Sequence, residues 1–256
     1  TTGNVSYSFD AENQITSAIH YVASNELPKM YYLTGHGEAQ LSSTLQGYIE
    51  DDNVELVSLS LLSEGSVPED CDCLLIYSPA DDISEDEKAM LLTYMEAGGK
   101  MFIITGQTES DLTNLYAIGA EYGIEASNRI VFEGNSNSYY QYPYYLLPNE
   151  ASHDITDPLI DGGYHILQPV AHSLKQIDNV RSTLEVTGLL ETSSSSYAKA
   201  NPENASTLEK ESGDAEGPFY TAMASTESFD DKETKLVWFS SVNMLDDNID
   251  MAVSGA

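Results

Sequence analysis

Short apolar runs that end in Gly, Ser or Pro recur through the first half of the chain, at residues 30–34, 71–77 and 101–105. The segments between these runs carry apolar residues at helical spacing. Continuous apolar runs are typical of parallel strands, because helices bury such strands from solvent. The pattern therefore predicts a βαβ sheet whose polar turns meet at the carboxyl edge of the strands. That edge is where open α/β sheets bind ligands.

The predicted helices have recognisable ends. Residues 39–50 place Leu41, Leu45 and Ile49 on one face. Residues 84–87 read as a capping box that opens a helix, and the Gly pair at 98–99 ends it. Further elements are expected as helices at 11–25 and 113–122, as a helix start or turn at 153–159, and as strands at 54–59, 130–132, 164–170, 184–191, 219–225 and 235–242.

The chain changes character at Gly134. From there to Pro148 it carries five tyrosines among Asn, Ser, Gln and Pro, which predicts an irregular excursion. Tyr140 and Tyr142 within it are candidate ligand-binding residues, because tyrosine offers an apolar face and a hydrogen-bonding tip. A flap that packs on its own sheet is the alternative interpretation.

The chain has 256 residues, of which 41% are hydrophobic, so it can bury a full core. No convincing linker interrupts the pattern. We expect one elaborated α/β domain over residues 1–256, with a helical lead-in at 1–27 and an insertion-rich region at 134–217.

The charge is strongly negative, with 10 Lys and Arg against 42 Asp and Glu and a formal net charge of -32. Such a surface repels phosphate backbones and holds too few cations to release DNA counterions. Nucleic acid is therefore excluded as a partner. A highly solvated surface explains this acidity better than a cation-binding one does.

No metal site is predicted. Asp81 with Asp82, and the cluster at 246–250, lack the spacing of a calcium loop. Cys71 and Cys73 share one face of a strand, where two small buried hydrophobes are expected, and no zinc pattern surrounds them.

The candidate site is the carboxyl edge of the predicted sheet. It would be formed by Gly35, His36, Gly37 and Glu38, with Ser78, Gln107 and Asn243 as neighbours. A histidine and a carboxylate without a nucleophile or metal do not complete a mechanism, so no catalytic residue and no cofactor are assigned. Alternatively, the glycines of this turn adopt positive φ and Glu38 caps the next helix.

An ordered set of motifs, spread from about Phe9 to Asn243, resembles the GldG-type family. These proteins are auxiliary, extracytoplasmic components of ABC transporters, named after gliding motility. The motifs are, in chain order, Phe9 to Glu12, Ile15 to Ile19, Tyr31 to Glu38, Leu75 to Pro79, Ser84 to Glu87, Gly98 to Ile104 and Gly217 to Phe219.

The resemblance implies an α/β fold with a mainly parallel sheet and helices on both faces. This fold is flavodoxin-like or class I glutamine-amidotransferase-like, with an irregular Tyr-rich insertion and additional C-terminal strands. It also implies location on the extracytoplasmic face of the cell membrane, membrane helices beyond both ends of this chain, and permease and ATPase subunits as partners. The amidotransferase reaction does not carry over, because no Cys follows the strand at residues 101–105.

The leading hypothesis is a non-enzymatic domain that binds a partner protein or a transported ligand. One alternative is carbohydrate recognition by the tyrosine segment. Another is a degenerate amidotransferase-like hydrolase that uses His36 and Glu38, which needs a Ser or Thr hydroxyl about 3 Å from His36.

Overall fold

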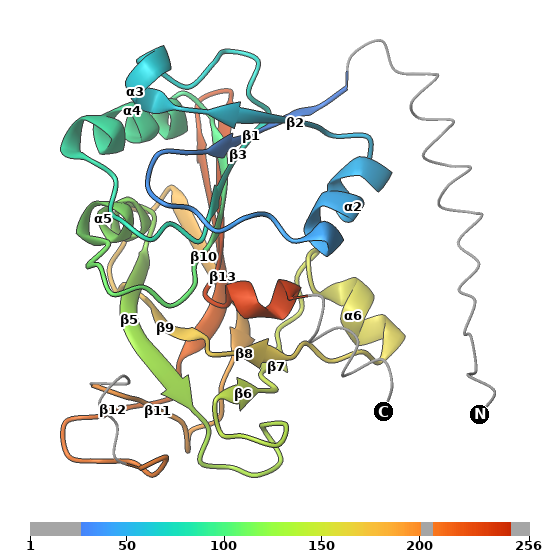
Figure 1. The fold of residues 1–256 in the computed structure, drawn as a ribbon, viewed down its shortest axis with the longest axis vertical. Coiled ribbons are helices and arrows are strands. Elements are labelled where there is room, and N and C mark those ends of the chain that lie inside the picture. Colours follow the sequence, from blue (N-terminus) through green and yellow to red (C-terminus); the bar gives the residue numbers. More distant parts are fainter. Residues whose placement is uncertain (1–26, 201–206, 247–256) are drawn as a thin grey trace.

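A twelve-stranded mixed sheet runs through the chain in the computed structural model, which describes residues 27–200 and 207–246 (Figure 1). The helix expected at 11–25 lies outside the described residues, as does nearly all of the lead-in at 1–27. None of the helices in the described ranges is long and apolar enough to span a membrane.

Half of the sheet is parallel, and its strands lie in the order β2-β1-β3-β4-β14. Its strands are β1 (Lys29–Leu33), β2 (Glu55–Leu59), β3 (Cys73–Tyr77), β4 (Lys100–Ile104) and β14 (Lys232–Phe239). The helices of this half are α2 (Ser43–Asp51), α3 (Leu61–Glu64), α4 (Glu85–Glu96) and α5 (Thr113–Glu121).

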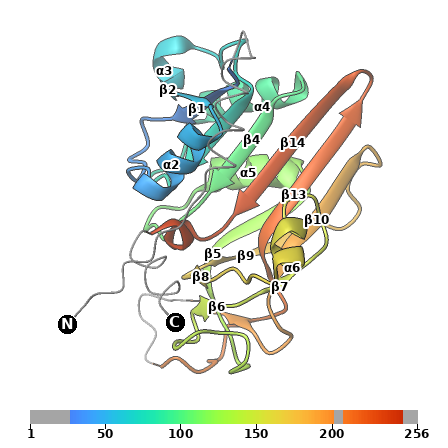
Figure 2. The same cartoon turned by 90° about the vertical axis from the view of Figure 1, so that its right-hand side faces the viewer.

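The other half is antiparallel and joins the first through the β13–β14 hairpin (Figure 2). Its longer strands are β5 (Ile124–Phe132), β9 (His172–Gln176), β10 (Leu184–Glu191) and β13 (Tyr220–Phe229). The short elements are β6 (Tyr145–Leu146), β7 (Asn149–Glu150), α6 (Asp157–Gly162), β8 (Gln168–Pro169), β11 (Tyr197–Ala198), β12 (Ala215–Glu216) and the 3₁₀ helix η2 (Val242–Leu245).

The prediction of an α/β fold is confirmed, but the sheet, expected to be mainly parallel, is mixed, and several elements differ from expectation. The strand expected at 184–191 is confirmed as β10, and residues 134–217 also contribute the unexpected strand β9 to the main sheet. The strand expected at 164–170 is reduced to β8, and β5 begins six residues before the predicted start at Ile130. Strands β8 and β9 and the first part of β5 carry many polar residues. Pairing with neighbouring strands, and not a continuous apolar run in the sequence, therefore determines where they begin and end.

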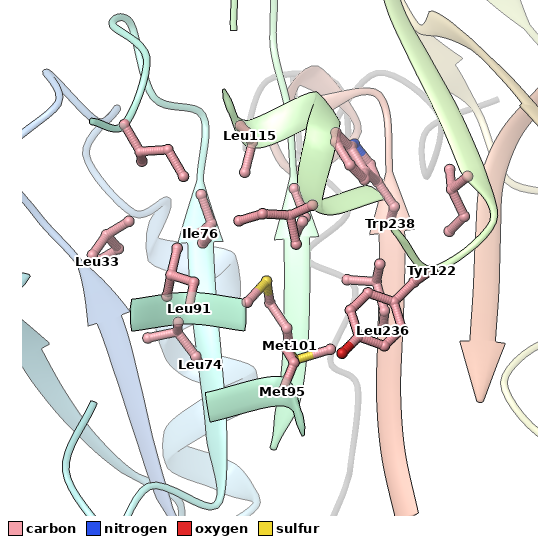
Figure 3. Close-up of a cluster of buried hydrophobic side chains, with 14 of the residues drawn as sticks. Leu33, Leu74, Ile76, Leu91, Met95, Met101, Leu115, Tyr122, Leu236 and Trp238 are labelled. Carbon is pink, nitrogen blue, oxygen red and sulfur yellow. The ribbon is translucent and has the colours of Figure 1, made fainter. Parts of the chain in front are cut away.

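One face of the parallel strands packs against α4 and α5 (Figure 3). Leu74 and Ile76 of β3 meet Leu91 and Met95 of α4 in this cluster, and all four side chains are buried. Trp238 of β14 lies at the α5 end of the same cluster. Its indole N–H donates to the Thr105 hydroxyl at 3.0 Å, which satisfies the polar atom of a fully buried side chain.

The alternate residues of β3 pack in a second hydrophobic cluster, on the other face of the sheet. Leu75 and Tyr77 of β3 pack there with Leu45 and Ile49 of α2. Successive side chains of a strand point to opposite faces, so β3 contributes to both clusters and is buried along its length. The parallel half is therefore a rigid base for the loops at its edge.

Gly119 in α5 tests how tightly this core is packed. A Cβ at this position would lie 2.6 Å from the Trp238 ring and 2.9 Å from the Ile124 carbonyl oxygen. Alanine normally stabilises a helix relative to glycine by about 0.5–1 kcal/mol. We predict that Gly119→Ala instead lowers the free energy of unfolding by ~1–3 kcal/mol, measured by urea denaturation, because the core is overpacked.

Gly47 in α2 is the matched control, because a Cβ there meets no atom within 4 Å. Gly47→Ala should raise the free energy of unfolding by about 0.5–1 kcal/mol. Equal effects of the two substitutions would contradict the packing described here.

Candidate functional site

The strand order of the parallel half reverses at β1. The chain leaves β1 toward β2 on one side, and then returns to place β3 on the other side of β1. The loops after β1 and β3 therefore lie next to each other at a topological switch point, which is where open α/β sheets form a crevice. Gly35 to Glu38 follow β1 and Ser78 to Asp82 follow β3, so both predicted turns lie at this rim.

Backbone hydrogen bonds hold the two rim loops together. The His36 carbonyl accepts from the N–H groups of Ala80 and Asp81, both at 2.9 Å, and Ala39 N–H donates to the Ser78 carbonyl at 3.1 Å. Gly37 has a φ of +68°, and a Cβ on it would lie 3.1 Å from the Ala80 Cβ. The loops can approach this closely because residue 37 is glycine.

His36 lies between two carboxylates. Its Nδ1 is 2.9 Å from Glu38 Oε1 and its Nε2 is 3.1 Å from Glu87 Oε1. Only 6% of the residue surface is exposed. The rim loop after β1 is therefore joined, through one imidazole, to the first turn of α4.

Each carboxylate also accepts hydrogen bonds from backbone groups. Glu38 Oε2 accepts from the N–H groups of Gly35 and His36 at 3.0 and 2.9 Å. Glu87 Oε2 accepts from the Ser84 N–H at 2.9 Å and from the Ser84 hydroxyl at 2.7 Å. The capping box predicted at the start of α4 is formed, and its glutamate has a second partner in His36.

The alternative interpretation of Glu38 as a helix cap is wrong in its detail. The next helix, α2, begins at Ser43 and not at Ala39, and its N-cap is Ser42, whose hydroxyl accepts from the Leu45 N–H. Glu38 instead binds the amides of its own turn. Gly35, with a φ of +122°, and Gly37 have the positive φ that this interpretation predicted.

The electrostatics of the three residues favour a charged imidazole. The hydrogen bond with Glu38, helped by Glu87 and opposed by burial, raises the pKa of His36 from 6.5 to about 9. Burial raises the pKa of each carboxyl group, but hydrogen bonds from His36 and from neighbouring groups outweigh it. The pKa of Glu38 and the pKa of Glu87 are consequently both below the usual value.

This arrangement does not supply a general base. A protonated imidazole has no lone pair, and both ring nitrogens of His36 already contact carboxylates. No ring nitrogen is left for a Ser or Thr hydroxyl, which is the geometry that the hydrolase alternative requires. His36 and Glu38 position the rim loop.

The remaining predicted rim residues follow β3, β4 and β14. A Cβ on Gly106 would lie 2.6 Å from both Ser78 Oγ and Val242 Cγ1, so the structure brings the ends of these three strands together. Gln107 is exposed beside Gly106, and Asn243 is half-buried in η2.

Sequence reasoning missed two residues of this region. The sequence predicts Glu87 only as part of the capping box, because its contact with His36 spans 51 residues of chain. His172 is buried, and its Nε2 donates to the Gly106 carbonyl at 2.6 Å. Burial lowers the pKa of His172, so this imidazole is neutral. Its hydrogen bond to Gly106 fixes the loop that follows β4.

Tyr140 and Tyr142 belong to the tyrosine segment, whose strand β6 pairs with β8, and β8 contacts η2, the helix that carries Asn243. The tyrosine segment packs on β5 and β11, where Tyr144 contacts Phe132. The Tyr142 ring stacks on Tyr144 at 5.5 Å with an angle of 10° between the planes, and Tyr142 remains 47% exposed.

The acidic residues near the rim have structural partners. Asp82 accepts from the N–H groups of Asn114 and Leu115 at 2.7 and 3.1 Å, and so caps α5 from another loop. Asp81 accepts from the Ser110 hydroxyl. Within residues 27–200 and 207–246, no group of three or more His, Cys, Asp and Glu side chains could hold a metal ion.

The cysteines also have structural surroundings. Cys71 and Cys73 are free and half-buried, which is less buried than predicted. Burial raises the pKa of the Cys71 thiol, and raises that of Cys73 to about 11. Neither thiol is therefore activated as a nucleophile.

The pH dependence of stability tests the buried ion cluster. The folded-state pKa of His36 is higher than its ordinary value, so its contribution is complete below about pH 6.5 and is lost as the pH rises through about 9. We predict that the free energy of unfolding falls by on the order of 3 kcal/mol between these values, measured by urea denaturation at several pH values.

His36→Gln should remove this alkaline decrease in the free energy of unfolding, whatever its effect on absolute stability. Identical alkaline slopes in the wild-type chain and in His36→Gln would show that His36 does not cause the decrease.

The lowered pKa values of Glu38 and Glu87 predict a second, acidic loss of stability as the pH falls below about 4.5.

Comparison with known proteins identifies the family. The N-terminal domain of mmIFT52 has a similar structure, with a TM-score of 0.59, 15% sequence identity, and coverage of 86% of this chain and 88% of that one. At this identity the likeness shows the fold alone. No curated protein matches the chain. The model of the family ABC_transp_aux, described as "ABC-type uncharacterized transport system", matches residues 27–255. The chain therefore belongs to this family of ABC transport auxiliary proteins.

Proposed function

We propose that this chain is a non-enzymatic, extracytoplasmic domain of a GldG-type auxiliary protein, and that its rim binds a partner protein or a transported ligand. The permease and ATPase subunits of the same transport system are the proposed partners, reached through the full-length protein. The proposal depends on one observation. The switch-point rim is well ordered by hydrogen bonds, but its histidine is held between two carboxylates and has no free nitrogen.

We also infer that the parallel half is flavodoxin-like, with helices on both faces. Its order β2-β1-β3-β4-β14 corresponds to the order 2-1-3-4-5 of that fold, with β14 in the fifth place. The packing of α4 and α5 in one cluster and of α2 in the other supports this inference. In flavodoxin-like folds, ligands bind at the switch point between the first and third strands.

The binding surface we propose consists of the exposed residues around the buried ion cluster. Gly35, Gly37 and Gln107 are exposed at the rim, and Ser78 and Asn243 are partly exposed. His36 and Glu38 hold the loop in place beneath this surface. Rigid loops lose little conformational freedom on binding, which favours recognition of a defined partner.

The extracytoplasmic location rests on the resemblance to the GldG-type family, and the acidic surface is consistent with it. A net charge of this size keeps a domain soluble and repels anionic headgroups, so the chain would not lie flat on an anionic membrane. We propose that membrane helices outside this chain anchor it. A protease-accessibility assay on intact cells distinguishes the two sides of the membrane.

Substitution of exposed rim side chains tests the binding proposal. The double variant Gln107→Ala with Asn243→Ala should leave the melting temperature unchanged, because neither side chain is part of the core. Co-purification of the permease with full-length protein should fall about ten-fold if the two side chains together contribute ~1.4 kcal/mol to binding.

The matched control is Glu64→Ala with Glu69→Ala, two exposed positions outside the rim. This pair should leave co-purification unchanged. Normal recovery of the permease with the rim variant would reject the rim as the contact surface.

Carbohydrate recognition is the second candidate function, because Tyr142 is half-exposed and its ring is held parallel to Tyr144. Sugars stack on ordered aromatic rings of this kind. If this function holds, a glycan array should show binding by the wild-type chain that Tyr142→Ala abolishes. Tyr48→Ala, which removes an exposed tyrosine of α2, should bind normally. A blank array would eliminate this candidate.

A further inference from the structure

A groove lies at the edge opposite the rim, where the carboxyl ends of α4 and α5 meet the turn of the β13–β14 hairpin. Figure 2 shows this hairpin ending beside α4, and the Thr234 hydroxyl donates to the Met95 carbonyl at 2.6 Å. The groove has a volume of about 570 Å³. Its principal lining residues are Leu92, Glu96, Glu121, Tyr122, Phe229 and Lys232.

The groove contains an exposed apolar side chain. Phe229, at the last position of β13, is 64% exposed, although the hairpin turn beside it is polar. Leu92 of α4 and Tyr122 after α5 line the same groove. Large aromatic side chains are enriched at protein interfaces, where they act as anchors.

The charges around this apolar surface are mostly negative. Glu96 and Glu121 are exposed at the ends of α4 and α5, and neither helix has a basic residue in its last turn. The carbonyl groups at the end of α4 therefore add partial negative charge, whereas the Glu121 carbonyl at the end of α5 accepts a hydrogen bond from Arg181. The hairpin turn adds Asp230 and Asp231, both exposed.

The guanidinium in the groove is already paired. Arg181 donates to both carboxylate oxygens of Glu227 at 2.5 and 2.6 Å, and to the Glu121 carbonyl at 2.5 Å. It also lies over the Tyr122 ring, 5.2 Å from the centroid. Lys232 is the other cation that lines the groove.

We propose that this groove docks a basic segment of a partner protein in which Lys or Arg lies beside an apolar residue. The cationic group would bind near Glu96 and Glu121, at the two helix ends, while the apolar residue packs on Phe229 and Leu92. Charge complementarity determines the choice of partner, because a chain with a net charge of -32 attracts basic surfaces and repels acidic ones. This inference is independent of the rim, which lies at the opposite edge.

A labelled peptide in which Lys and Arg alternate with Leu is the probe, and fluorescence anisotropy gives its dissociation constant. Glu96→Gln with Glu121→Gln should weaken binding at least about five-fold, and Phe229→Ala should do so by a similar factor. The matched control, Glu64→Gln with Glu69→Gln, removes the same charge elsewhere and should change binding less than about two-fold.

Two further peptides separate the apolar contribution to binding from the charged contribution. Replacing the Leu residues by Ser should reproduce the effect of Phe229→Ala, and replacing the basic residues by Gln should abolish binding. Circular dichroism confirms that each protein variant is folded. The proposal is overturned if the control pair weakens binding as much as the groove pair, since attraction would then come from the whole acidic surface. It is also overturned if the peptide does not bind, or if the groove pairs two copies of this chain, seen as a dimer that Phe229→Ser dissociates.

Discussion

One imidazolium between two carboxylates holds the carboxyl edge of the sheet together. His36 joins Glu38, which binds the amides of its own turn, to Glu87, which completes the capping box of α4. Buried charges are costly unless they are paired and hydrogen-bonded, and every oxygen of these two carboxylates has a partner. Removing the imidazole would leave two largely buried carboxylates without the cation that they share. The loop after β1 and the start of α4 therefore depend on the same ring.

In the function that we propose, this constraint makes the rim a surface for recognition. The topology places the loops after β1 and β3 where α/β sheets bind ligands, and the ion cluster then engages the only titratable nitrogens of that turn. What remains exposed is backbone at Gly35 and Gly37 and amide side chains at Gln107 and Asn243. Membership of an ABC transport auxiliary family agrees with a docking role.

Much of the parallel half could be predicted, because burial on both faces leaves a continuous apolar run at residues 73–77 and at 101–104. The antiparallel half could be predicted only in part. Strands β10 and β13 match the expectations at 184–191 and 219–225, whereas β9 and the first six residues of β5 mix polar and apolar residues and give no strand pattern. His172–Gln176 contains two residues with long polar side chains at its end, and its strand state follows only from pairing with β5 and β13. The candidate site could likewise be predicted only in part. The turn at Gly35 to Glu38 was found from its composition, whereas its link to Glu87 was not.

The sequence by itself determined the local structure of this protein: the capping box at Ser84, the helix end at Gly98, and the acidic surface. These features depend on residues a few positions apart or on composition alone. Only the tertiary structure decided which groups meet across the chain, such as His36 with Glu87 and Arg181 with Glu227. Strand order sets these contacts, and strand order depends on the burial of whole sheet faces, which no short segment of sequence records.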